Sequence, residues 1–134
     1  LHIWRINMSE AQKFSHHEGD KSEFEQRGLR SYFEYRDLGV ADASNGEVIA
    51  HVIRAKEGSN ATGDWHVHDC NFQMYYVIKG WINFEYEGHG FKTAKAGDCV
   101  MQPAGIRHRE MEHSEDLELI EIVSPADFQS RMVD

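Results

Sequence analysis

Residues 66–80 read HVHDCNFQMYYVIKG, and residues 97–108 read GDCVMQPAGIRH. In the first stretch, His66 and His68 are separated by one residue, so on a strand their side chains point to the same face. Both imidazoles can therefore reach one metal ion. An HxH pair alone is weak evidence for a metal site, because a strand histidine is more often a satisfied surface or core group.

Two further residues extend this pair. Gln73 opens the strand that returns after a turn at 69–71, so it lies opposite the histidines, and its amide oxygen suits a hard metal ion. His108 opens another strand after a tight turn at 103–105. Three imidazoles and one oxygen that converge inside a barrel form a ligand set for one divalent transition metal, and Fe(II), Mn(II), Zn(II), Ni(II) and Cu(II) all fit it.

The rest of the chain predicts an all-β fold. From Ser31 onward, short runs rich in Val, Ile, Tyr, Phe and Trp alternate with Gly- and Pro-containing turns. They predict nine strands, at 32–36, 47–56, 64–70, 72–79, 81–86, 91–94, 99–102, 107–112 and 117–123. Many short strands with almost no helix between them indicate an antiparallel sandwich or barrel.

The two ends differ from this pattern. Residues 1–30 are polar and patternless and predict an N-terminal arm, flexible or exchanged with a partner subunit, with a short helix over 18–26 as the alternative. Residues 31–134 are predicted to form the single barrel domain. A short C-terminal helix is predicted after Ser124, because Ser caps helices and Pro125 suits the first helical position.

Charge and composition exclude several classes of function. The chain has 14 basic and 23 acidic side chains and a net charge of −9, which argues against binding nucleic acid or an anionic membrane surface. No apolar run approaches the roughly 20 residues of a membrane helix, and residues 1–7 lack a signal-peptide pattern. Met8 is a candidate start. Two cysteines are too few for a disulfide scaffold, so we expect a reducing, cytoplasmic location.

The two quoted stretches resemble the paired signatures of the cupin superfamily, and in particular its small single-domain members. The first signature reads here as HVH at 66–68, four residues, Gln73, six residues and Gly80. The second reads as Gly97, five residues, PAG at 103–105, two residues and His108. The resemblance implies a double-stranded β-helix, or jelly-roll barrel, with a metal held by His66, His68, Gln73 and His108. It also implies a homodimer, since small cupins commonly pair through a sheet face.

Two residues depart from the family pattern. The usual glutamate ligand is Gln73 here, and the asparagine that often ends the second signature is Glu112. Three imidazoles and an amide are all neutral, so a divalent ion would keep its full charge in the cavity. We therefore expect a small, anionic or chelating substrate, such as an enolate, a carboxylate or a phenolate.

Alternation places further residues near the ion. Tyr75 shares the face of Gln73 and is either a substrate-orienting hydroxyl or a barrel-filling aromatic. Gln102 occupies a usually apolar position and contacts either a ligand or the backbone. Glu110 shares the face of His108 and is a candidate general base if it points inward, but is solvated if the strand bulges. The direction of His51 is undetermined, and a structural role is expected for it.

Three functions fit these residues. The resemblance implies, first, a metal-dependent dioxygenase that acts on a small enolisable diketone or aromatic substrate. The second is a non-redox, zinc-type polyketide cyclase or isomerase, since some single-domain cupins with a glutamine ligand look like cyclases; Glu110 would then remove a proton. The third is a small-ligand sensor without turnover. The dioxygenase is slightly preferred over the cyclase.

Overall fold

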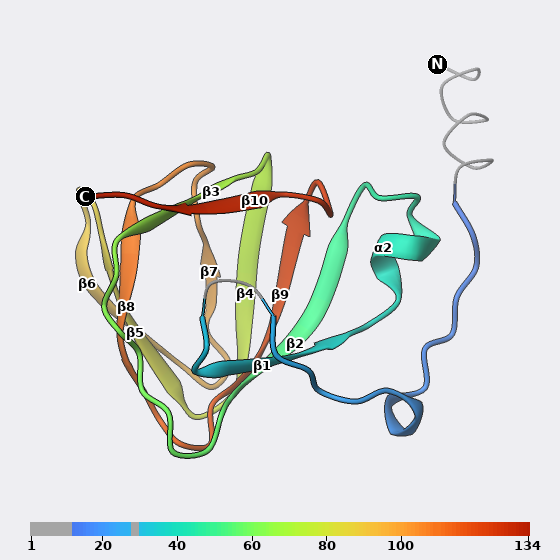
Figure 1. The fold of residues 1–134 in the computed structure, drawn as a ribbon, viewed down its shortest axis with the longest axis horizontal. Coiled ribbons are helices and arrows are strands. Elements are labelled where there is room, and N and C mark those ends of the chain that lie inside the picture. The colour runs from blue at the N-terminus through green and yellow to red at the C-terminus, as the bar shows by residue number, and fades with distance from the viewer. Residues whose placement is uncertain (1–11, 28–29) are drawn as a thin grey trace.

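The structure, a computed structural model, describes residues 12–27 and 30–134 (Figure 1). Its strands, in chain order, are β1 (Phe33–Asp37), β2 (Ile49–Ala55), β3 (His66–Asp69), β4 (Phe72–Lys79), β5 (Trp81–Tyr86), β6 (Gly90–Lys95), β7 (Cys99–Met101), β8 (His108–His113), β9 (Glu118–Ser124) and β10 (Gln129–Met132). Two short helical segments accompany them, η1 (Gly19–Lys21) and α2 (Val40–Ala43).

The strands form two five-stranded antiparallel sheets that face each other. One sheet has the order β1-β2-β9-β4-β7 and the other has the order β10-β3-β8-β5-β6. This is the predicted all-β jelly roll, and all nine predicted strands are present within one or two residues of the predicted ends. The alternation that predicted them is visible in β9, where every second side chain is buried.

The core lies between the sheets. It consists of aromatic and aliphatic side chains from both, namely Tyr32, Phe33, Tyr35, Ile53, Tyr75, Val77, Ile82, Phe84, Tyr86, Ala94, Leu117 and Leu119. The buried polar side chains come from both sheets, and the predicted metal ligands lie on β3, β4 and β8.

The predicted C-terminal helix is wrong. In its place β10 pairs antiparallel with β3, with Ser130 opposite His68 and Met132 opposite His66. The cap signal at Ser124 is local, and an isolated helix of so few residues is marginal in water. The open edge of β3 offers unpaired backbone groups, which the terminal segment satisfies as a strand.

The N-terminal arm lies partly outside the described residues, since 1–11 are not described. Residues 12–27 run along the barrel of the same chain, where the Lys13 amide donates to the Ala43 carbonyl at 2.8 Å and Glu25 pairs with Tyr35 across a β-bridge. The alternative helix over 18–26 is reduced to the three-residue turn η1. Whether the arm exchanges between subunits stays a prediction.

Among residues 12–27 and 30–134, no helix has the length and hydropathy needed to cross a membrane. The cytoplasmic location inferred from the cysteines stays a prediction.

Candidate metal centre

Three histidines from two neighbouring strands converge inside the barrel. His66 and His68 lie one pleat apart on β3, and His108, the first residue of β8, is directly opposite His66 in the sheet. Each side chain is almost fully buried, and their candidate ligand nitrogens all lie within 4.8 Å of one another. This spacing suits a single metal ion, as the HxH pattern and the second signature predict.

The hydrogen bonds of the rings fix which nitrogen each one presents. Nδ1 of His66 donates to the carbonyl of Asp64 at 2.9 Å, and Nδ1 of His108 donates to the carbonyl of Ile106 at 2.9 Å. Nδ1 of His68 pairs with the Ser130 hydroxyl at 2.6 Å. In His66 and His108 the donating Nδ1 leaves Nε2 with its lone pair for a metal, and in His68 an Nδ1 that donates to the hydroxyl does the same.

The Nε2 atoms of His66 and His68 are buried and have no hydrogen-bond partner in the part of the chain that the structure describes. Buried polar atoms are rarely left unpaired in proteins, and each such atom calls for an explanation. Burial also lowers the pKa of all three rings, to about 3 for His68 and about 4 for His108. The imidazoles are therefore neutral at pH 7, which is the state that binds metals. These residues fit a divalent transition metal.

Gln73 lies on β4, is buried, and is oriented by a carboxylate. Its Nε2 donates to Oε2 of Glu121 at 2.8 Å. An ionised carboxylate can only accept, so the amide nitrogen must face Glu121 and the amide oxygen is free on the other side. The role of Gln73 as the fourth ligand stays a prediction, and this orientation is the one it requires.

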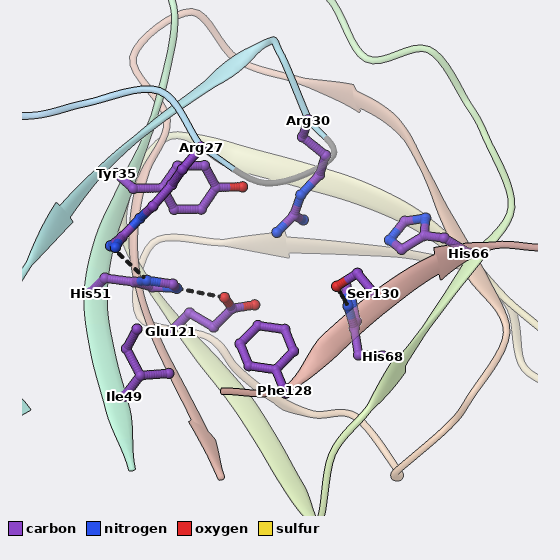
Figure 2. Close-up of a pocket in the computed structure, with 10 residues that line it drawn as sticks. All are labelled: Arg27, Arg30, Tyr35, Ile49, His51, His66, His68, Glu121, Phe128 and Ser130. Atoms are coloured by element: carbon purple, nitrogen blue, oxygen red, sulfur yellow. Dashed lines mark hydrogen bonds and ion pairs between the residues drawn. The ribbon is translucent and has the colours of Figure 1, made fainter. Parts of the chain in front are cut away.

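The same carboxylate begins a hydrogen-bond chain that reaches the N-terminal segment. Oε1 of Glu121 accepts from Nε2 of His51 at 2.7 Å, and Nδ1 of His51 is 3.1 Å from a guanidinium nitrogen of Arg27 (Figure 2). Arginine can only donate, so Nδ1 of His51 accepts and its Nε2 carries the proton. Burial alone would raise the pKa of Glu121, but its bond to His51 and the charge of Arg30 outweigh burial and hold it at about 2.

A cavity of about 140 Å³ opens beside His66 and His68. Figure 2 shows Arg30 pointing into this cavity from the N-terminal side, above Glu121 and Phe128. Its other lining residues are Arg27, Tyr35, Ile49, His51 and Ser130. A smaller void of about 10 Å³ lies deeper and shares Arg30 and Glu121 with the cavity, and its lining includes Gln73, Tyr75, Gln102 and His108. The predicted ligands are thus divided between the two spaces.

Two of the predicted catalytic residues belong to a chain of hydroxyls and amides that ends at His108. The Tyr75 hydroxyl is 3.2 Å from the Tyr86 hydroxyl, which donates to Oε1 of Gln102 at 2.9 Å. Nε2 of Gln102 is 3.5 Å from Nε2 of His108. Burial raises the pKa of both tyrosines, so both remain protonated and able to donate. Their catalytic roles stay predictions.

Glu110 points inward and is 1% exposed, so the strand does not turn it to solvent. Its Oε2 pairs with Nδ1 of His113 at 2.9 Å, and it is not among the residues that line the cavity or the deeper void. Burial raises the pKa of its carboxyl. Its role as a general base stays a prediction, and this position separates it from the cavity.

Sequence reasoning missed Glu121 and Arg30 and left the direction of His51 open. A signal for Glu121 exists in the sequence, because it shares a strand face with Leu117, Leu119 and Val123, and a lone carboxylate on an apolar face requires a partner. The four predicted ligands are neutral, but their surroundings are not. A carboxylate lies one hydrogen bond behind Gln73.

The profile of the cupin domain family matches residues 52–123, more than half of the chain. The chain belongs to this family. The match runs from β2 to β9 and so contains both signatures and all four predicted ligands. A comparison with curated proteins gives no match.

Solved structures with the same fold are similar over most of the chain. The polyketide cyclase RemF from Streptomyces resistomycificus superposes with a TM-score of 0.72 at 13% identity, covering 91% of this chain and 87% of its own. A variant of Streptomyces PAC13 with uridine gives 0.67 at 16% identity, with coverages of 91% and 92%. An RmlC-like cupin from Shewanella frigidimarina gives 0.63 at 24% identity, with coverages of 87% and 96%. At these identities the likeness establishes the fold alone.

Proposed function

We propose that this cupin is a metal-dependent enzyme that acts on a small substrate without a net change of oxidation state, as a lyase, isomerase or cyclase does. One observation carries the proposal. Three preorganised, neutral imidazole nitrogens lie together, two of them on a cavity that also presents a guanidinium and the third, on His108, beside a chain of hydroxyls and amides. These groups polarise a bound molecule and move protons, which is the work of non-redox catalysis.

A divalent ion held by His66, His68, His108 and Gln73 would act as a Lewis acid toward a substrate oxygen. The chain supplies the remaining functions. Glu121 orients the amide of Gln73, and the pair of Gln102 and Tyr86 offers a protonated hydroxyl and an amide beside His108. In this proposal Gln102 and Tyr75 act by positioning that hydroxyl rather than by contacting substrate.

Cavity size limits the substrate. The space of about 140 Å³ is close to the roughly 150 Å³ cavity that holds one benzene molecule. Pockets for drug-sized ligands are larger, about 300–1,000 Å³. This supports a substrate smaller than an aromatic polyketide. Two similar structures, the cyclase RemF and Pac13, described as a nucleoside dehydratase, are non-redox enzymes by name, which points the same way.

The dioxygenase is the second candidate. The observation that favours it is the neutral three-histidine set itself, which suits Fe(II) as well as Zn(II). The two candidates differ in their need for oxygen and for a redox-active metal. A sensor without turnover would bind a ligand but convert none.

Metal analysis of protein purified from its native host tests the choice, followed by anaerobic loading with Zn²⁺ or Fe²⁺. We expect zinc or another redox-inert metal and no oxygen uptake with a panel of β-diketones. Oxygen uptake by the iron-loaded protein that His68→Ala abolishes, and that the exposed-site control His16→Ala retains, would replace the proposal with the dioxygenase.

We further propose that the protein is a homodimer that buries the outer face of the β1-β2-β9-β4-β7 sheet. Support comes from apolar side chains on β4 and β7 that are 37–53% exposed, namely Phe72, Tyr76, Ile78 and Met101. Light scattering at micromolar concentration should give about twice 15.5 kDa. Ile78→Lys should shift the mass to the monomer, and an unchanged mass would place the interface elsewhere.

A further inference from the structure

We propose that Arg30 forms a carboxylate-binding subsite within the cavity, so that the substrate is a small carboxylic acid with a second oxygen that reaches the histidines. This inference deepens the proposed function and rests on it for the reaction, but not for binding. Arg30 precedes β1 and points into the cavity that His66 and His68 line (Figure 2).

In the part of the chain that the structure describes, the guanidinium of Arg30 is not directly paired with an anion, although the charge of Glu121 acts on it within the same cavity. Of the ion pairs within 4.0 Å in the described ranges, none includes Arg30. The carboxylate in the same cavity, Glu121, already uses both oxygens, one for His51 and one for Gln73. Burial raises the pKa of the Tyr35 phenol, so it stays uncharged and does not neutralise Arg30. A partly buried cation with no directly paired anion is costly, and a bound carboxylate would reduce that cost.

The geometry of the cavity selects one carboxylate. A guanidinium presents two parallel N–H groups that match the two oxygens of a carboxylate. The other arginine in the cavity, Arg27, is engaged with His51 and with the carboxylate of Glu25 at 4.0 Å. Ile49 and Phe128 supply an apolar wall. One guanidinium outside any ion pair of the described residues, one apolar wall and one metal position fit a small monocarboxylate with a carbonyl or hydroxyl oxygen.

Calorimetry with pyruvate tests the subsite in the zinc-loaded protein. Pyruvamide, which replaces the carboxylate with a neutral amide, is the ligand control. We expect Arg30→Gln to weaken pyruvate binding about tenfold to a hundredfold, as for a lost charged hydrogen bond, and to leave pyruvamide binding unchanged. Arg54→Gln, an exposed arginine on β2 that pairs with Glu34, should change neither.

Arg30→Lys keeps the charge but loses the two parallel N–H groups of the guanidinium, so its pyruvate affinity should fall between those of the wild type and Arg30→Gln. It also serves as the test if Arg30→Gln fails to fold. Pyruvate affinity that is independent of Arg30, or absent in the wild type, overturns the subsite. Tighter binding of inorganic phosphate than of pyruvate overturns the assignment to a carboxylate. Arg30-dependent pyruvate binding without turnover of any substrate would sustain the subsite and refute the proposed enzyme.

Discussion

Exchanging the charges of Gln73 and Glu121 tests whether these two residues act as one unit behind the metal. In the wild type the Gln73 amide donates to Glu121 at 2.8 Å. Gln73→Glu alone would bring two carboxylates to that distance. Two unit charges 2.8 Å apart repel by about 6 kcal/mol at an effective dielectric constant of about 20, enough to keep one of them protonated at neutral pH in the apo protein.

The opposite change removes an acceptor. Glu121→Gln leaves one amide oxygen for two donors, those of His51 and Gln73, so one buried donor loses its partner at a cost of about 1–3 kcal/mol. It also frees Gln73 to rotate its oxygen toward the new amide and away from the histidines. Because partners that orient metal ligands typically contribute about tenfold to a hundredfold in affinity, we expect zinc affinity to fall by that factor.

The double variant should recover what each single variant loses. Its amide at position 121 can donate to the carboxylate at position 73 while its oxygen still accepts from His51. Competition with a chromophoric chelator gives zinc affinity, and urea unfolding of the apo protein gives stability. Glu118→Gln, on the same strand with its ion pair at the surface, is the matched control. Additive effects of the two single changes, or full zinc affinity in Glu121→Gln, would refute the coupling.

Three further predictions concern the histidines and the barrel. The apo protein should lose stability as pH falls from about 6.5 toward 4. The pKa values of His68 and His108 are lowered to about 3 and about 4 in the folded protein, so over this range only the unfolded chain gains protons at these residues. Urea midpoints that stay flat over this range would contradict the prediction. Ser130→Ala should weaken zinc binding about tenfold, because Nδ1 of His68 loses its partner, and chelator competition measures this. Gly80→Ala should destabilise the fold by more than about 2 kcal/mol, since its Cβ would meet Ser114 and the backbone of residue 117. Gly88 has a similar positive φ but lies in open space, so Gly88→Ala should cost only about 1–2 kcal/mol. Urea unfolding measures both.

Local alternation is the reason that most of the fold follows from the sequence. In β4 and β5 the pattern of apolar and polar residues, closed by the turn at Gly80, gives both strands with their observed ends. The pair of His66 and His68 follows from the same two-residue period. Predicting the position of His108 requires the family signature as well, because β8 pairs with β3 although the two strands are far apart in the sequence.

Other features depend on pairings that are remote in sequence. The terminal segment becomes β10 because β3 has a free edge, and a helix-cap signal cannot report that edge. Glu121 reaches Gln73 because β9 lies beside β4, although the two residues are 48 positions apart. Ile120 and Ile122 are apolar on the opposite face of β9, so the sequence alone does not decide which face is inside. Arg30 lies before β1, outside any strand, so the alternation of apolar and polar residues does not predict where its side chain points.

The placement of Glu121 changes the meaning of the glutamine in the ligand set. The family's usual glutamate would bind an ion through its own charge. Here the carboxylate belongs to Glu121, which lies one hydrogen bond behind Gln73 and acts through the Gln73 amide. A glutamate at position 73 would face this carboxylate across 2.8 Å, so the two positions cannot both carry the charge without a proton between them. With Gln73 as the predicted ligand, negative charge is therefore retained near the site while the direct ligand is neutral and weaker. In our proposal, that arrangement would leave the ion both more electrophilic toward a substrate oxygen and more ready to exchange a ligand, and Arg30 would add the positive charge that selects an acid.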